Sequence, residues 1–260
     1  MKAGISIAIL ALLLAMQAAL PRPCFPSEQL QSQQVKKIIS GVVKAYGGDA
    51  ALGKVRTVVV RGTIRGFVKG DQGSYQRYYE RPRKLRVETV YDRSAETRVL
   101  NGERGWRGSN GAPLTEVKGP PFLAMAYQYK YLDLPLGLLD HPYRISYGGK
   151  ETLGGTEVDV LLLSDPEGPP MRVYIDSRTR IIRRVAGEFV MGEMGGAELA
   201  VEFSDYRPVD GVLFPFKMVN YAGGTTIAET VVSEVGVNPK LDEELFKPDG
   251  RRPAAPSHPQ

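Results

Sequence analysis

The strongest constraint on the fold of this chain is a long succession of short β-type segments separated by turn residues. It begins near Thr57, where β-branched residues dominate, and continues to Val235 with an interruption between 114 and 141. The separators include Asn101-Gly102 and Asp210-Gly211, pairs that favour tight turns. Short strands joined by tight turns are typical of an antiparallel meander, so the sequence predicts a mainly β fold.

The pattern predicts eleven or twelve strands in a single sheet. The segments that fit strands are 57–64, 73–80, 84–91, 95–100, 104–107, 143–148, 153–164, 171–175, 181–190, 198–206, 213–222 and 226–235. One antiparallel sheet of this size curves, and its concave face has to be filled or closed. We therefore predict a large curved sheet that forms a half-open β-barrel.

Helices are expected at the start of the chain and in its middle. Residues 27–46 carry one apolar stripe at helical spacing, and Gly47-Gly48 follows as a stop signal. A second helix is expected at 122–132, after Pro120-Pro121, with a further turn at 135–139. Both helices could plug the concave face, and a concavity that they fill incompletely would be an apolar pocket.

The N-terminus has the order of a secretory signal. A positive start at Met1-Lys2 is followed by an apolar run from 5 to 14 and then by Pro21 and Pro23. The run is shorter than the ~20 apolar residues that a spanning helix needs, which disfavours the alternative of a retained anchor. We expect residues 1–23 to be a signal peptide with an undecided cleavage point and the protein to be periplasmic.

The only cysteine, Cys24, follows this segment directly, so no intramolecular disulfide can form. Its position would suit a lipid-modified N-terminus at the outer membrane. However, Pro23 stands where a small residue is expected, and we favour an unmodified thiol. A half-barrel domain is then expected at 27–248, and a disordered tail rich in proline, alanine and arginine at 249–260.

Charge and motif content give little sign of nucleic-acid binding or catalysis. The net charge of the whole chain is only +5, and an exported protein does not meet nucleic acid. His141 is the only histidine before the tail, and no serine stands in a G-x-S-x-G motif. We predict no enzyme activity, no catalytic residues and no metal. The basic clusters at 81–86 and 178–184 are expected on a solvated face, with peripheral contact to anionic lipid headgroups as the alternative.

Two stretches of the second half resemble motifs of the outer-membrane lipoprotein carrier superfamily, the LolA/LolB-like and RseB-like half-barrels. Residues 173–182, VYIDSRTRII, resemble its strand–turn–strand motif, and residues 203–215, FSDYRPVDGVLFP, resemble its F-x-D-Y-x-x-V-D-G motif. The order of signal, helix, strands, central helices and strands also matches. The resemblance covers about Gln29 to Pro248.

This resemblance implies a periplasmic carrier that holds the acyl chains of a lipid or lipoprotein in an apolar cavity, without a cofactor and without catalysis. The residues expected to line the cavity are Val87, Trp106, Phe122, Met125, Tyr129, Leu132, Phe189, Phe203, Phe216 and Met218. The alternative is a non-catalytic envelope sensor or scaffold of RseB-like type that binds a protein partner. A carrier needs a cavity of ligand size, whereas a scaffold could have a filled core.

Overall fold

The computed structural model describes residues 28–140, 143–190 and 195–250. The strands are β1 (Thr57–Gly66), β2 (Gln72–Glu80), β3 (Lys84–Tyr91), β4 (Ala95–Asn101), β5 (Arg104–Ser109), β6 (Thr115–Val117), β7 (Arg144–Leu153), β8 (Thr156–Ser164), β9 (Met171–Asp176), β10 (Ile182–Val190), β11 (Gly196–Val209), β12 (Val212–Ala222) and β13 (Thr225–Val237). The helices are α1 (Glu28–Ala45), α2 (Asp49–Leu52), α3 (Pro120–Asp133), α4 (Gly137–Asp140) and the 3-10 turn η2 (Glu243–Phe246).

All 13 strands belong to one sheet, in the order β6-β5-β4-β3-β2-β1-β13-β12-β11-β10-β9-β8-β7. Every pairing is antiparallel, and the chain returns from β13 to lie beside β1. Strands β6 and β7 are the two free edges, so the sheet does not close on itself. The prediction of a mainly β, half-open barrel is confirmed.

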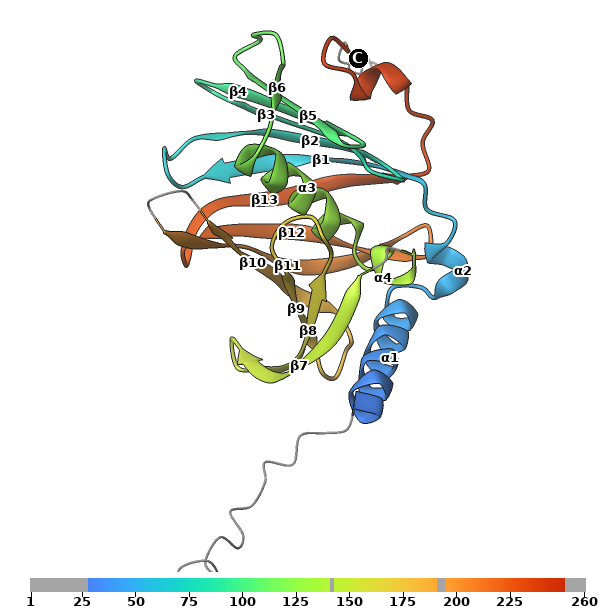
Figure 1. The fold of residues 1–260 in the computed structure, drawn as a ribbon. Helices are drawn as coiled ribbons and strands as arrows, with labels where there is room; N and C mark the ends of the chain where they lie inside the picture. Colours follow the sequence, from blue (N-terminus) through green and yellow to red (C-terminus); the bar gives the residue numbers. More distant parts are fainter. Residues whose placement is uncertain (1–27, 141–142, 191–194, 251–260) are drawn as a thin grey trace, which may run out of the picture.

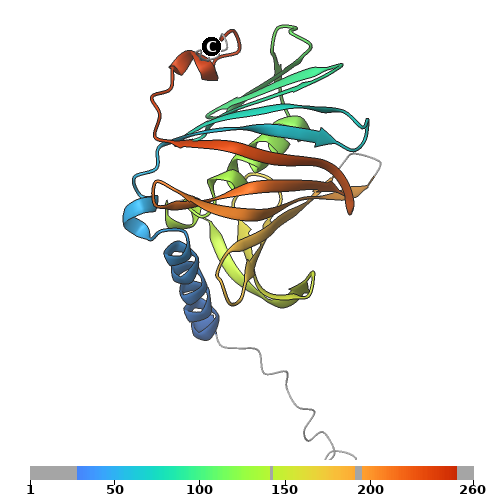
Figure 2. The ribbon, with the colours of Figure 1, turned by 180° about the vertical axis from the view of Figure 1, so that it is seen from behind.

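Helix α3 lies on the concave side of this sheet (Figure 1). The view from behind shows strands β12 and β13 in front of the helix (Figure 2). Helix α1 lies at one end of the molecule, against edge strand β7. The sheet therefore encloses one central helix, and α1 contributes to the same apolar core from the end.

The alternation of side chains along the strands decides which residues meet α3. Leu85 and Leu100 are directly paired across β3 and β4 and lie in the large core cluster with Met125 of α3. Their neighbours along the chain point to the opposite, convex face, as the period of two requires. Val99 is one of these, and it belongs to a separate apolar cluster.

The C-terminal turn η2 covers part of the convex face. Leu245 and Phe246 pack there with Val99 and Trp106. Arg86 fixes the turn by donating a hydrogen bond of 3.0 Å from Nη1 to the carbonyl oxygen of Leu245. The end of the described chain is thus part of the folded structure.

The junction of α1 with the sheet depends on a glycine. Gly47 has a φ of 120°, and a Cβ there would lie 2.2 Å from the carbonyl oxygen of Gly211. This close approach lets Leu213 donate a hydrogen bond of 3.2 Å to the carbonyl oxygen of Tyr46. The tight turn predicted at Asp210-Gly211 therefore also contacts the segment that follows α1.

One predicted boundary is wrong. The strand expected at 143–148 continues through Gly148-Gly149 to Leu153 as β7, and the turn lies at Gly154-Gly155, inside the segment expected at 153–164. The pairing of β7 with β8 shifts register between Tyr147 and Gly149, so the glycines accommodate an irregularity inside the strand. The short edge strand β6 was not predicted.

Several expectations concern residues outside the described ranges. They are the signal peptide at 1–23, Cys24, His141 and the tail from 251 onward. In the ranges that the structure does describe, no helix is both long and apolar enough to cross a membrane.

Candidate ligand cavity in the concave face

A cavity of about 240 Å³ lies between α3 and the concave face of the sheet. Its walls come from the two halves of the sheet, β1–β4 on one side and β11–β13 on the other, together with α3. The lining residues are Ile64, Tyr75, Thr89, Tyr91, Glu96, Arg98, Ala124, Tyr127, Gln128, Tyr131, Leu132, Leu199, Ala200, Met218, Asn220, Tyr221, Ile227, Ala228 and Thr230. A smaller hollow of about 60 Å³ shares Tyr131 and Leu132 with this cavity and is also lined by Arg77 and Phe203.

Glycines on the sheet set how closely α3 approaches. A Cβ at Gly187 would lie 2.6 Å from the hydroxyl oxygen of Tyr127, and one at Gly105 would lie 3.1 Å from the ring of Phe122. Tyr127 also meets Phe189 edge to face, with 5.0 Å between the ring centroids. Side chains of α3 thus contact the backbone of the sheet at these two glycines. The cavity is the space that remains beside the helix.

The cavity wall is amphipathic. In the described structure the buried hydroxyl of Tyr127 and the buried Oε1 of Gln128 have no hydrogen-bond partner. Burial raises the pKa of Tyr131 to about 12, Tyr75 adds to the increase, and the positive charges of Arg98 and Arg77 oppose it. At neutral pH Tyr131 is therefore a neutral hydroxyl that can donate a hydrogen bond.

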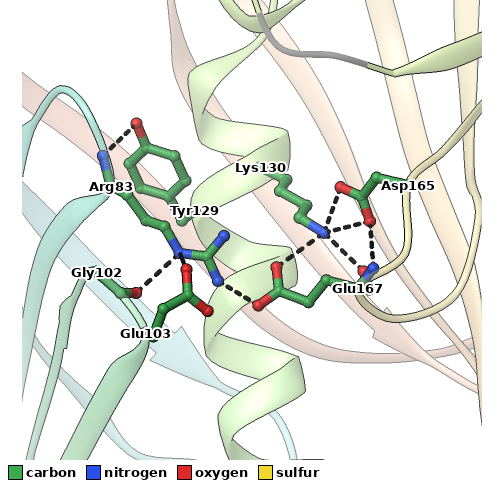
Figure 3. A network of polar contacts seen from close by, with 7 residues as sticks. All are labelled: Arg83, Gly102, Glu103, Tyr129, Lys130, Asp165 and Glu167. Atoms are coloured by element: carbon green, nitrogen blue, oxygen red, sulfur yellow. Dashed lines mark hydrogen bonds and ion pairs between the residues drawn. The ribbon is translucent and has the colours of Figure 1, made fainter.

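A polar network holds α3 against both halves of the sheet (Figure 3). Lys130 of α3 is buried, and its Nζ lies 2.7 Å from Oδ2 of Asp165 and 3.0 Å from Oε2 of Glu167. Both acids belong to the loop between β8 and β9. Glu167 also pairs with Arg83, in the turn between β2 and β3.

Arg83 extends this network to the other half of the sheet. Its Nε donates a hydrogen bond of 2.8 Å to the carbonyl oxygen of Gly102, and its backbone N–H donates one of 2.9 Å to the hydroxyl of Tyr129. Burial alone would raise the pKa of Glu167, but the hydrogen bonds from Arg83 and Lys130 outweigh it and hold that pKa below its ordinary value. The network therefore joins two distant parts of the sheet across the helix.

A second buried cluster holds the end of α3. Asp133 accepts hydrogen bonds from the hydroxyl of Tyr79 and, at 3.0 Å, from Nε of Arg81. Burial raises the pKa of Asp133 against the opposing charge of Arg81. Arg81 also contacts Asp140 of α4, 2.5 Å away, so one arginine links the two central helices.

The structure brings most of the predicted cavity residues to the concave side, although few line the cavity itself. Leu132 and Met218 line it, and Phe203 lines the smaller hollow. The other residues that pack in the surrounding core are Val87, Phe122, Met125, Tyr129, Phe189 and Phe216. Their role in lipid binding stays a prediction.

The placement of Trp106 on the cavity side is wrong. Trp106 is paired with Val99 on the convex face, where it packs beside Leu245 and Phe246. The adjacent Gly105 faces α3 instead. Within β5 the side chains alternate between faces, so Gly105 and Trp106 cannot both point to the concavity.

The polar residues of the cavity were missed in the sequence. Tyr127, Gln128 and Tyr131 lie on α3, and Arg98 lies on β4. A search for apolar residues passes over them, although residues 127, 128 and 131 share one side of a helix through their i, i+3 and i+4 spacing. Among the described residues, no group of three or more His, Cys, Asp or Glu side chains could hold a metal ion.

No family model matches the sequence, and no curated protein matches it. Solved structures do match its fold. A LolA superfamily protein from Nitrosomonas europaea is similar over 82% of this chain and 96% of its own, at 11% identity and a TM-score of 0.54. The chain has the LolA-like fold.

Two further structures agree with this LolA-like fold. A DUF1329 family protein from Desulfovibrio piger matches over 82% of this chain and 97% of its own, at 14% identity and a TM-score of 0.53. A domain from Vibrio parahaemolyticus that is named for outer membrane lipoprotein sorting matches over 81% and 94%, at 14% identity and a TM-score of 0.52. The fold expected from the two sequence motifs is therefore confirmed.

Proposed function

We propose that this protein binds the acyl chain of a lipid or lipoprotein in the cavity beside α3 and carries it through the periplasm. The observation that carries the proposal is the cavity of about 240 Å³ left between a well-anchored helix and an open sheet. The cavity is partly open, so without an occupant its apolar wall faces water. An acyl chain would remove that apolar surface from water.

The composition of the wall supports an amphiphilic occupant. Apolar side chains such as Ile64, Leu199 and Met218 line the cavity beside tyrosine hydroxyls and amides. Burying acyl surface there would contribute about 25 cal/mol per Å². Pockets that bind small molecules typically combine such apolar walls with a few polar groups. These groups suit binding, and we propose binding without catalysis.

The test is lipid uptake by a variant whose cavity is filled. Ala124 lines the cavity from α3, so Ala124→Phe places a ring in the space without removing any packed side chain. The matched control is Ala112→Phe, at an exposed turn position. Native mass spectrometry of periplasmic protein, followed by titration with a fluorescent fatty acid, measures bound and added ligand.

We expect the wild type and Ala112→Phe to bind the fatty acid alike, and Ala124→Phe to bind at least tenfold more weakly with an unchanged circular dichroism spectrum. A wild-type protein that carries no lipid and takes up no fatty acid would overturn the proposal. That result would favour the alternative function, a non-catalytic envelope scaffold that binds a protein partner.

A further inference from the structure

Arg77 of β2 is a buried cation that forms no ion pair with the residues the structure describes. Only 7% of its surface is exposed. Among the described residues its Nε has no hydrogen-bond partner, and the contact of its Nη1 is a weak one of 3.8 Å to the sulfur of Met218. No carboxylate of the described residues lies within 4.0 Å of its guanidinium nitrogens.

Arg86, the other buried arginine of the sheet, is paired, and so is the half-buried Arg81 in the turn after β2. Arg86 binds Glu88 at 2.7 Å, and Arg81 binds Asp133 at 3.0 Å. Removing a guanidinium from water without a compensating partner is costly, whereas a paired one is stabilised by charge-assisted hydrogen bonds. Arg77 is therefore the exception among these arginines, and its guanidinium is available to a partner in the hollow that it lines.

Arg77 lies where a ligand in the cavity would reach it. It lines the smaller hollow together with Tyr131 and Leu132, and both of these residues also line the larger cavity. Its contact Met218 lines the larger cavity from the other half of the sheet. Arg77 thus lines a hollow that adjoins the larger cavity through the α3 residues Tyr131 and Leu132.

A second arginine shares this face. Arg77 is paired with Val87 on β3, and Val87 is paired with Arg98 on β4. Two strand spacings separate the arginines, about 10 Å between backbones. Arg98 lines the larger cavity and lies 3.7 Å from Glu96, so it is at least partly neutralised, unlike Arg77. The positive charges of both arginines act to lower the pKa of the Tyr131 hydroxyl.

We infer that Arg77 is the counter-ion for the headgroup of an anionic amphiphile, whose carboxylate or phosphate points inward to Arg77 and whose acyl chain fills the cavity beside α3. The planar fork of a guanidinium matches both oxyanions and binds them through two parallel hydrogen bonds. Tyr131 supplies a neutral donor beside it. This inference rests on the proposed acyl binding and names the charge of the ligand.

The experiment compares three single-chain probes that differ only in the headgroup: hexadecanoate, hexadecyl phosphate and hexadecanol. Displacement of a fluorescent fatty acid gives the Kd of each for the wild type, Arg77→Met and Arg77→Lys. Arg61→Met is the matched control, because Arg61 is exposed on β1 and pairs with Glu234. Circular dichroism and thermal unfolding verify that each variant is folded.

We expect the wild type and Arg61→Met to bind at least one anion tenfold or more tightly than hexadecanol. Arg77→Met should lose this preference while its affinity for hexadecanol changes less than threefold, and Arg77→Lys should keep part of it. The stability of Arg77→Met should not fall, since the substitution removes an unpaired buried charge. The anion that binds more tightly indicates a free fatty acid or a phosphate-bearing lipid as the source.

Equal binding of anions and alcohol by the wild type, or an anion preference that survives in Arg77→Met, would overturn the assignment of Arg77 and leave acyl binding intact. Absence of binding by all three probes would overturn acyl binding itself. The two failures are therefore distinguishable in one set of titrations.

Discussion

At the scale of single residues, some tyrosine hydroxyls inside the barrel have hydrogen-bond partners and another has none in the described structure. Tyr206 donates a hydrogen bond of 2.6 Å to the carbonyl oxygen of Ile182 and accepts one of 3.0 Å from Tyr46. The buried hydroxyl of Tyr127 has no partner in the described structure. Buried polar groups are usually paired, and an unpaired one lowers stability.

This contrast predicts opposite effects of the same substitution. Tyr206→Phe should destabilise the fold by about 1–2 kcal/mol, because it leaves the Ile182 carbonyl unpaired. Tyr127→Phe should leave stability unchanged or raise it by up to about 1 kcal/mol, because it removes an unsatisfied hydroxyl. Urea unfolding of both variants measures the two values. If Tyr127→Phe lowers the free energy of unfolding as much as Tyr206→Phe does, the Tyr127 hydroxyl forms a hydrogen bond in the folded protein.

Residue patterns also explain which parts of the site could be read from the sequence. Tyr75, Arg77 and Tyr79 share one face of β2, but the opposite face carries Gln76 and Tyr78, so neither face stands out as apolar. The neighbours of Trp106 at two residues' distance are Arg104 and Gly108, which give no signal of its orientation. Periodicity predicts a buried face only where apolar and polar residues alternate.

At the scale of elements, α3 is held by charged groups at its sides as well as by its apolar surface. Lys130 meets Asp165 and Glu167 from the second half of the sheet, while Glu167 also binds Arg83 from the first. The helix is therefore anchored by loops that are distant from it in sequence, and no short sequence pattern relates these loops to the helix. This is why its existence could be predicted from the sequence but its anchoring could not.

The anchoring of α3 should depend on pH through Glu167. Its folded-state pKa lies below the ordinary 4.5, so its stabilising contribution is complete above about pH 4.5 and is lost as the pH falls through the lower folded value. Glu167→Gln should cost about 2 kcal/mol at pH 7, and the difference from the wild type should shrink towards pH 3. Urea unfolding at several pH values measures this difference.

The matched control for that experiment is Glu244→Gln, because Glu244 is exposed and pairs only with Lys247 in the described structure. It should differ from the wild type by less than about 1 kcal/mol throughout. Hydrogen exchange of the α3 amides, measured at pH 7, should speed up in Glu167→Gln and stay unchanged in the control. A constant difference between Glu167→Gln and the wild type at every pH would contradict the proposed ion pairs.

At the scale of the whole molecule, the order of elements and the strand pattern predict the half-open barrel, because every strand pairing joins neighbours in sequence except that of β13 with β1. The packing of η2 on the convex face could not be predicted in this way. Leu245 and Phe246 reach back to strands near the start of the sheet, more than a hundred residues earlier. Such long-range packing leaves no periodic signal in either segment.

The last turn of the described chain should therefore stabilise the whole barrel. Phe246 is almost fully buried, and Phe246→Ala should reduce the free energy of unfolding by about 3–5 kcal/mol. Trp106, the only tryptophan, packs in the same cluster, so its fluorescence reports the change directly and should shift to longer wavelength as water enters. Phe67→Ala, at a largely exposed position in the turn after β1, is the control and should change neither value appreciably. An unshifted Trp106 spectrum together with unchanged unfolding would mean that η2 is not docked on the convex face in solution.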